Sequence, residues 1–219
     1  MYQYGYSEAK LEELLVSYCK SCGFNDAIRA VRYAAEKHAG QKRMNGQPFI
    51  IHPYFVAWYG ICSFANDENW ICANLLHDVC EDCGVSPDEL PFSDETKEIV
   101  GYLTFDYHYD EGDDENERRR KKIHQKGIHY AELIASPKAL ISKGFDRYHN
   151  LLTVEDLPEN NIRKNVLETH RHLLPRFYDA LTLDAYKQYH MMLYKLSIDI
   201  CGINGEIAFT HGIELNTMS

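Results

Sequence analysis

The chain has 219 residues, of which 45% are hydrophobic, and a formal net charge of −10. This length suits a single domain that buries a sizeable core. The acidic balance argues against nonspecific nucleic-acid binding, because proteins with that activity present basic surfaces to the phosphate backbone. An anionic small molecule is still compatible with this charge, provided that a local basic cluster or a metal ion holds it.

The sequence also predicts the compartment. No segment approaches the roughly 20 consecutive apolar residues of a membrane span, and the first six residues lack the basic and apolar parts of a secretory signal. Seven cysteines, an odd number in a chain of this length, suit a reducing environment better than a disulfide framework. We therefore expect a cytoplasmic protein that has no membrane partner.

Apolar residues recur with helical spacing through the first part of the chain. This pattern predicts a helix from Glu8 to Cys22 and a second that starts at Asn25 and ends at Gly40. An ordered loop is expected from Gly40 to Pro53, followed by a helix from Tyr54 to Phe64. One continuous helix is then expected from Asn69 to Cys83.

The helical pattern continues to the end of the chain, broken by one charged segment. The acidic stretch from Asp110 to Glu115 and the basic stretch from Arg118 to Lys122 are expected to form a solvated loop followed by a charged helix face. With Pro175 and Gly202 as helix breakers, further helices are expected over 93–103, 128–135, 138–154, 162–174 and 183–200. The prediction is a compact all-α domain over 1–219, whose residues 181–219 are a helical C-terminal extension.

The clearest chemical signature is the segment from Leu75 to Asp82. Here His77 and Asp78 are adjacent, and Glu81 and Asp82 follow one helical turn later. Residues three and four apart on a helix share a face, so a continuous helix would gather these groups on one side. Carboxylates crowded beside an imidazole are costly unless a cation neutralises them. The pattern therefore predicts a metal site.

Three segments, in this order, resemble the motifs of the HD-domain hydrolases of the RelA/SpoT alarmone family. They are Gly40–Pro53, Leu75–Asp82 and Lys143–Leu151, and the resemblance covers about residues 26–180. It implies a compact multi-helix HD-domain fold and removal of the 3′-pyrophosphate from guanosine tetra- or pentaphosphate (ppGpp or pppGpp), usually with Mn²⁺. No second region of synthetase size is present, so a small stand-alone hydrolase is expected.

The resemblance also implies a role for each of eight residues. It makes four of them the ligands of one metal ion, namely His52, His77, Asp78 and Asp146. It assigns two carboxylates, Glu81 and Asp82, to the attacking water. It places Arg43 beside the base and Asn150 beside the ribose of the nucleotide.

The chemistry of this set agrees with the resemblance. Two imidazoles and two carboxylates form a mixed nitrogen and oxygen site that suits Mn²⁺ and leaves positions open for water and a phosphate oxygen. Such an ion lowers the pKa of bound water and neutralises charge on the phosphoryl group. A nearby carboxylate that takes the water's proton typically contributes about 10²–10⁴-fold in rate.

Substrate phosphates need cationic partners, and the sequence offers three candidates. Lys143 lies three residues before Asp146 on the same helix, Arg163 follows the third motif, and the cluster Arg118–Lys122 is placed to fold over the entrance. Guanidinium groups favour bidentate phosphate contacts. His149 is expected to pack or to form a hydrogen bond.

Two other functions remain open. The first is a different HD-domain nucleotide phosphohydrolase, either a nucleotidase or a phosphodiesterase. The second is a noncatalytic nucleotide-binding regulatory protein that kept the fold. In all three cases the expected partner is a small-molecule nucleotide and not a nucleic acid, while the preferred base and the oligomeric state stay open.

Overall fold

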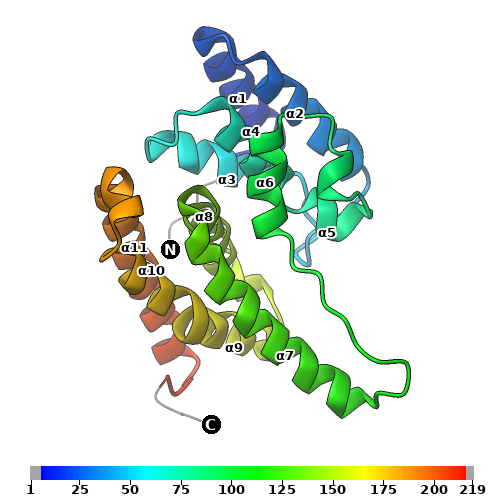
Figure 1. Cartoon of the computed structure of the whole chain (residues 1–219), viewed down its shortest axis with the longest axis vertical. Coiled ribbons are helices and arrows are strands. Elements are labelled where there is room, and N and C mark those ends of the chain that lie inside the picture. The colour runs from blue at the N-terminus through cyan, green and yellow to red at the C-terminus, as the bar shows by residue number, and fades with distance from the viewer. Residues whose placement is uncertain (1–5, 216–219) are drawn as a thin grey trace.

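The computed structural model describes residues 6–215, and all of its regular elements are helical (Figure 1). The first six helices are α1 (Glu8–Cys22), α2 (Asn25–Lys37), α3 (Ile51–Cys62), α4 (Glu68–Leu76), α5 (Val79–Cys83) and α6 (Asp94–Leu103). The other five are α7 (Glu115–Glu132), α8 (Pro137–Leu152), α9 (Glu159–Glu168), α10 (Leu174–Ala180) and α11 (His190–Thr210). Within residues 6–215 there is no strand, only one isolated bridge between Lys42 and Pro48. The all-α prediction is confirmed.

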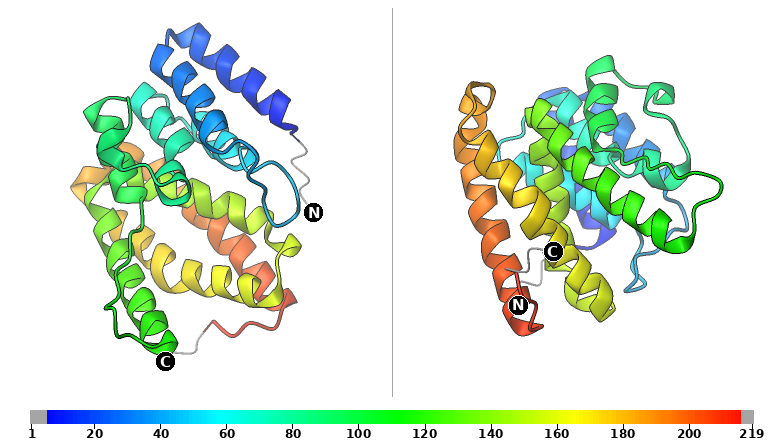
Figure 2. Two further views of the ribbon diagram at one scale, coloured as in Figure 1. Left: turned by 90° about the vertical axis from the view of Figure 1, so that its right-hand side faces the viewer. Right: turned by 60° about the horizontal axis from the view of Figure 1, so that its bottom comes forward.

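Helix α8 lies near the centre of the molecule and joins its two halves. It packs against α3 and α6 on one side and against α11 on the other, while α4 packs against α2, α3 and α6. Figure 2 shows α11 along an outer edge, with α10 beside it. Among the helices described, none combines the length and apolar character needed to cross a membrane.

Local sequence signals fix where α8 begins and how closely it packs. The Ser136 side chain accepts a hydrogen bond from the backbone amide of Ala139, and Pro137 occupies the first turn, where no amide donor is needed. At Gly144 the helix surface meets the C-terminal helices directly. A Cβ atom there would lie 2.5 Å from Cζ of Phe177 and 2.6 Å from Cδ2 of Leu196.

The prediction of one continuous helix from Asn69 to Cys83 is wrong, because the helix is interrupted at His77 and Asp78. Helix α4 ends at Leu76 and α5 begins at Val79. Nδ1 of His77 lies 2.8 Å from the carbonyl oxygen of Asn74, the acceptor that the amide of Asp78 would use in an unbroken helix. The side chain therefore competes with the backbone, and the two residues lie in the bend between two helices.

Two predicted helix starts are also corrected. Helix α3 begins at Ile51 rather than Tyr54, and Pro53 fits because it lies in the first turn. Helix α7 begins at Glu115 rather than Ile128, because the side chains of Asp114 and Glu117 each accept from the other residue's amide in a capping box. The basic cluster is thus a face of α7, as expected.

The two predicted C-terminal breakers do not break helices. Pro175 lies in the first turn of α10, and a π-helical turn, Thr169–Leu173, connects α9 to α10. Gly202 lies inside α11, which runs on to Thr210. Burial of other α11 residues, such as Ile200 and Ile207, outweighs the low helix propensity of this exposed glycine.

The extended segment 104–109 runs alongside α7, where each of its aromatic rings faces a cation. The distances from cation to ring centre are 4.3 Å for Arg118 over Tyr109, 4.0 Å for Lys122 over Tyr107 and 5.9 Å for Lys126 over Phe105. Alternate residues of an extended chain share a face, as do residues four apart on a helix, so the two spacings match. We refer to these three pairs as the cation–π ladder.

Candidate metal centre and phosphate cavity

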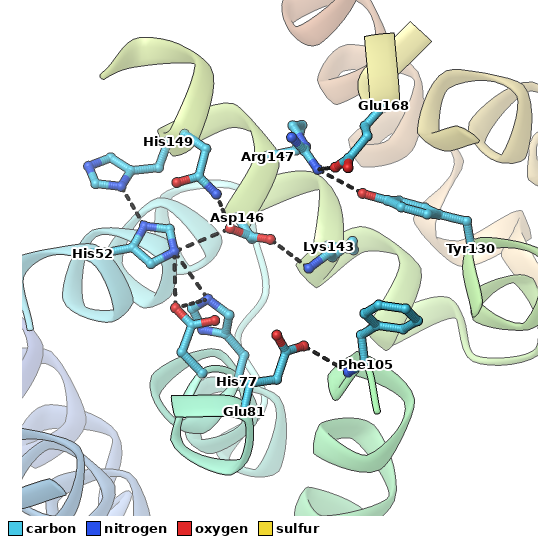
Figure 3. Close-up of polar contacts among 12 residues, drawn as sticks. His52, His77, Glu81, Phe105, Tyr130, Lys143, Asp146, Arg147, His149 and Glu168 are labelled. Atoms are coloured by element: carbon cyan, nitrogen blue, oxygen red, sulfur yellow. Dashed lines mark hydrogen bonds and ion pairs between the residues drawn. The ribbon is translucent and has the colours of Figure 1, made fainter. Parts of the chain in front are cut away.

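Three of the four predicted metal ligands, His52, His77 and Asp146, bring buried ligand atoms within 4.8 Å of one another (Figure 3), and Asp78 lies beside the two histidines. Nε2 of His52 lies 3.2 Å from Nε2 of His77, 3.4 Å from Oδ2 of Asp78 and 3.2 Å from Oδ1 of Asp146. Nε2 of His77 lies 3.2 Å from the same oxygen of Asp78. Three segments distant in sequence therefore deliver four ligand atoms to one place.

Each ligand reaches this point because of a local feature of its helix. His52 lies in the first turn of α3, next to Pro53. His77 and Asp78 occupy the bend between α4 and α5, where both side chains reach Nε2 of His52. Asp146 lies in the middle of α8 and is buried.

The charges in the cluster depend on one another. Burial opposes ionisation of every group, yet Asp78 raises the pKa of His77 and His77 in turn lowers the pKa of Asp78. Lys143 and His52 hold the pKa of Asp146 well below its ordinary value, despite its burial. Burial lowers the pKa of His52. The two carboxylates are therefore ionised at neutral pH.

The donor set fits a divalent metal ion. A neutral imidazole carries one N–H, and Nε2 of His52 has three polar neighbours within 3.4 Å, so one proton serves only one of them. A cation at this point would attract all four atoms at once. Two imidazole nitrogens with two carboxylate oxygens suit Mn²⁺, Fe²⁺ or Zn²⁺.

Glu81 and Asp82, the two carboxylates predicted to serve the attacking water, lie in different environments. Asp82 lines the cavity beside the cluster, where partial burial and the carboxylates of Asp78 and Glu81 raise its pKa to about 6. The carboxylate of Glu81 accepts a hydrogen bond of 2.7 Å from the backbone amide of Phe105 (Figure 3). Asp82 therefore has the ionisation behaviour of a general base, while Glu81 joins the cluster to segment 104–109.

A cavity of about 400 Å³ opens beside the metal cluster. At one end, Nη2 of Arg43 donates to Oδ1 of Asn150 at 3.2 Å and to Oγ1 of Thr153 at 3.0 Å. The amide of Asn150 in turn donates to Asp146. The residues predicted to contact base and ribose thus lie together and are hydrogen-bonded to a predicted metal ligand.

The other end of the cavity is cationic. It is lined by Lys126, Arg147 and Lys164, with Glu168 among them. Nζ of Lys126 lies 2.8 Å from Glu168, and Nη2 of Arg147 lies 3.3 Å from the same carboxylate oxygen. Lys126 and Arg147 pair with Glu168, whereas Lys164 has no ion pair with it, so three cations are balanced by one carboxylate and this part of the cavity attracts anions although the whole chain is acidic. We call these three basic residues the cationic end.

The cationic end differs from the phosphate partners expected from sequence. Arg163 is exposed and lies outside the cavity lining, whereas its neighbour Lys164 contributes to the lining. Arg118 and Lys122 belong to the cation–π ladder. The sequence analysis missed Lys126, although the signal was available, since it lies four residues after Lys122 on the same helix face.

Comparisons with known proteins find relatives named as guanosine-3′,5′-bis(diphosphate) 3′-pyrophosphohydrolases and as a GTP pyrophosphokinase. No family model matches the chain. It is 30% identical over 150 residues to a guanosine-3′,5′-bis(diphosphate) 3′-pyrophosphohydrolase of Borreliella burgdorferi, which covers 65% of this chain and 21% of that protein. It is 32% identical over 164 residues to a protein of the same name from Aquifex aeolicus, with coverages of 74% and 22%. A probable GTP pyrophosphokinase of Mycobacterium leprae is 33% identical over 144 residues, with coverages of 64% and 17%.

The chain therefore spans about a fifth of the length of these curated relatives. A solved structure described as a metazoan ortholog of SpoT that hydrolyzes ppGpp is 20% identical, covers 87% of this chain and 97% of that chain, and gives a TM-score of 0.49.

The fold and the cluster define the class of protein, a helical domain with a buried His–Asp cluster that is a candidate metal centre. The similarity to guanosine-3′,5′-bis(diphosphate) 3′-pyrophosphohydrolases agrees with the resemblance of the three motifs to the RelA/SpoT family.

Proposed function

We propose that the protein hydrolyses the 3′-pyrophosphate of guanosine 3′,5′-bispyrophosphate (ppGpp or pppGpp), or of a close nucleotide relative. The products are pyrophosphate and GDP or GTP. The observation that carries this proposal is the convergence of His52, His77, Asp78 and Asp146 beside a cavity with a cationic end. The names of the relatives from Borreliella burgdorferi and Aquifex aeolicus support the same reaction.

The four converging side chains would hold one Mn²⁺ ion, which supplies an acidified water and neutralises charge on the phosphoryl group. Asp82, with a pKa of about 6, is mostly ionised at pH 7 and accepts the proton of the attacking water. The cationic end binds phosphate oxygens, and Arg43, Asn150 and Thr153 bind the nucleoside. Lys143, which lines the cavity, and Arg163 stay predicted phosphate partners. The single domain over 1–219 and the cytoplasmic location also stay predictions.

A product assay distinguishes the proposal from its two alternatives. Purified protein with Mn²⁺ is incubated with 3′-pyrophosphorylated guanosine and adenosine nucleotides, and pyrophosphate and orthophosphate are measured separately. We expect pyrophosphate release that a chelator abolishes. Orthophosphate alone would favour a nucleotidase. Hydrolysis of a cyclic nucleotide, supplied in a parallel reaction, without pyrophosphate release from the 3′-pyrophosphorylated nucleotides would favour a phosphodiesterase, and nucleotide binding without turnover would favour a noncatalytic regulator.

A further inference from the structure

The two histidines of the metal centre are held by different acceptors. Nδ1 of His77 lies 2.8 Å from the backbone carbonyl oxygen of Asn74, a common arrangement for a histidine that binds metal through Nε2. Nδ1 of His52 instead lies 2.6 Å from Nδ1 of a third histidine, His149 (Figure 3). The ring of His149 thus takes the place that a carbonyl or carboxylate oxygen usually has.

The surroundings of His149 fix its ring. It is 6% exposed and stacks on Phe55, with ring centres 4.2 Å apart. Its plane is inclined by only 23° to that of His52, whose ring centre is 4.9 Å away, so the two imidazoles meet edge to edge through their Nδ1 atoms. His149 lies three residues after Asp146 on α8, so both side chains leave the same face of that helix. One helix therefore supplies a metal ligand and also the hydrogen-bond partner of a second ligand on α3.

The geometry determines where the protons must be when a metal is bound. Nε2 of His52 faces the other three ligands, so it must be free of a proton to coordinate an ion. The proton of the neutral ring then lies on Nδ1 and is donated to Nδ1 of His149. His149 must accept, which requires a neutral ring with its own proton on Nε2.

We propose that His149 is a positioning residue of the metal centre, which accepts the Nδ1 proton of His52 and thereby selects Nε2 of His52 as the ligand nitrogen. This inference rests on the metal site of the proposed function. It adds a group that touches neither metal nor substrate. Without this acceptor, the Nδ1 proton of His52 would be buried without a partner, and the ring would be free to turn its other nitrogen toward the cluster.

The test uses two variants of His149 and a control. His149→Phe keeps a ring to stack on Phe55 but removes the acceptor, whereas His149→Asn keeps an acceptor oxygen near the position of Nδ1. His172→Phe removes an imidazole that stacks on Tyr130, away from the cluster. The affinity for Mn²⁺ is measured by calorimetry at fixed pH, and circular dichroism checks the fold.

We expect His149→Phe to weaken Mn²⁺ binding about 10–100-fold, the usual cost of losing the partner of a metal-binding histidine. His149→Asn should recover most of the affinity, and His172→Phe should bind Mn²⁺ like the wild type. Unchanged affinity in His149→Phe, or equal weakening in His149→Asn, would overturn the proposal.

A second measurement uses only the wild-type protein and so does not depend on whether a variant folds. Nitrogen-15 spectra of the histidine rings in Zn²⁺-loaded wild-type protein should show His149 protonated on Nε2 and His52 protonated on Nδ1. The opposite assignment would refute the positioning role, as would a wild type that binds neither Mn²⁺ nor Zn²⁺. If metal binding depends on His149 but no pyrophosphate is released, the proposed function fails and the positioning role stands.

Discussion

The two oxygens of the Asp146 carboxylate face different partners. Oδ1 lies 3.2 Å from Nε2 of His52, and Oδ2 lies 2.9 Å from Nζ of Lys143. One oxygen therefore points into the metal cluster while the other is neutralised by a buried lysine. In the absence of a metal ion, Lys143 is the main positive charge that keeps this buried carboxylate ionised.

The first prediction concerns this buried ion pair. Lys143→Met should lower the free energy of unfolding of the metal-free protein by about 3 kcal/mol, because it leaves a buried carboxylate without its partner. Saturating Mn²⁺ should reduce this deficit, since the ion supplies the missing positive charge. Urea unfolding with and without Mn²⁺ measures both values. The control Lys195→Met breaks an exposed pair with Asp199 and should cost about 0–1 kcal/mol. If Lys143→Met lowered the free energy of unfolding equally with and without Mn²⁺, Lys143 would not be standing in for the positive charge of the metal ion.

The second prediction concerns proton release. Asp78 raises the pKa of His77, so this imidazole is protonated in the metal-free protein at pH 7 and must lose its proton to bind an ion. Mn²⁺ binding should therefore release protons, and the affinity should fall as the pH is lowered. Calorimetry in buffers of different ionisation enthalpy measures the release. Asp78→Ala should weaken Mn²⁺ binding by more than about 10–100-fold, which is the loss typical when a residue that only supports a ligand is replaced. Binding without proton release at pH 7 is the result that would count against this view.

The third prediction concerns the general base. Asp82→Asn should lower kcat about 10²–10⁴-fold, because the amide cannot accept the proton of the attacking water. In the wild type, kcat/KM should rise with pH as Asp82 ionises around its pKa of about 6. A pH profile of both proteins checks this, and the variant should lack the rise near pH 6. A variant that keeps the wild-type profile would remove Asp82 from the role.

The fourth prediction concerns stability at the same position. Because the folded protein raises the pKa of Asp82 above the ordinary value of 3.8, the native state binds this proton more tightly than the unfolded chain does. The carboxylate therefore costs stability progressively as the pH rises through about 6. Asp82→Asn should raise the Tm of the metal-free protein more at pH 8 than at pH 5. Thermal unfolding at both pH values measures this, and a larger gain at pH 5 would reverse the sign.

The fifth prediction concerns the cationic end. Lys164→Met should raise KM for the bis-diphosphate substrate about tenfold, as expected for the loss of one partly exposed charge-assisted contact. The change in kcat should be small, and the effect should weaken with added salt. Lys187→Met is a matched control, since this exposed lysine pairs with Asp184 away from the cavity. Steady-state kinetics that give both variants the same KM would exclude Lys164 from phosphate binding.

The helices were predictable where apolar periodicity alone determines them. The bend at His77 and Asp78 was not, because it depends on a bond between the His77 ring and one carbonyl oxygen, which leaves the periodicity unchanged. The run of α11 through Gly202 was missed for a related reason, since burial against α8 and α10 outweighs the propensity of one residue.

The candidate site was predictable to a different degree in each part. Residue type and spacing pointed to a metal site at His77 and Asp78, and the resemblance of the three motifs to the RelA/SpoT hydrolases implied His52 and Asp146 as its other ligands. The choice between Arg163 and Lys164 depends on which face of α9 turns toward the cavity, and that is decided by tertiary packing. The bond between His149 and His52 joins residues 97 positions apart, so sequence spacing gives no sign of it.

The close approach at Gly144 links the C-terminal helices α10 and α11 to the helix that carries Asp146. Even a single methyl group there would have to push aside both Phe177 and Leu196, and the helix that would tilt in response holds Asp146 two residues further on. Shortening Leu196 would relieve only one of these two contacts. The packing of α10 and α11 against α8 therefore helps to fix the position of Asp146. A substitution in either outer helix can change the distance between Asp146 and the other predicted ligands without lining the cavity.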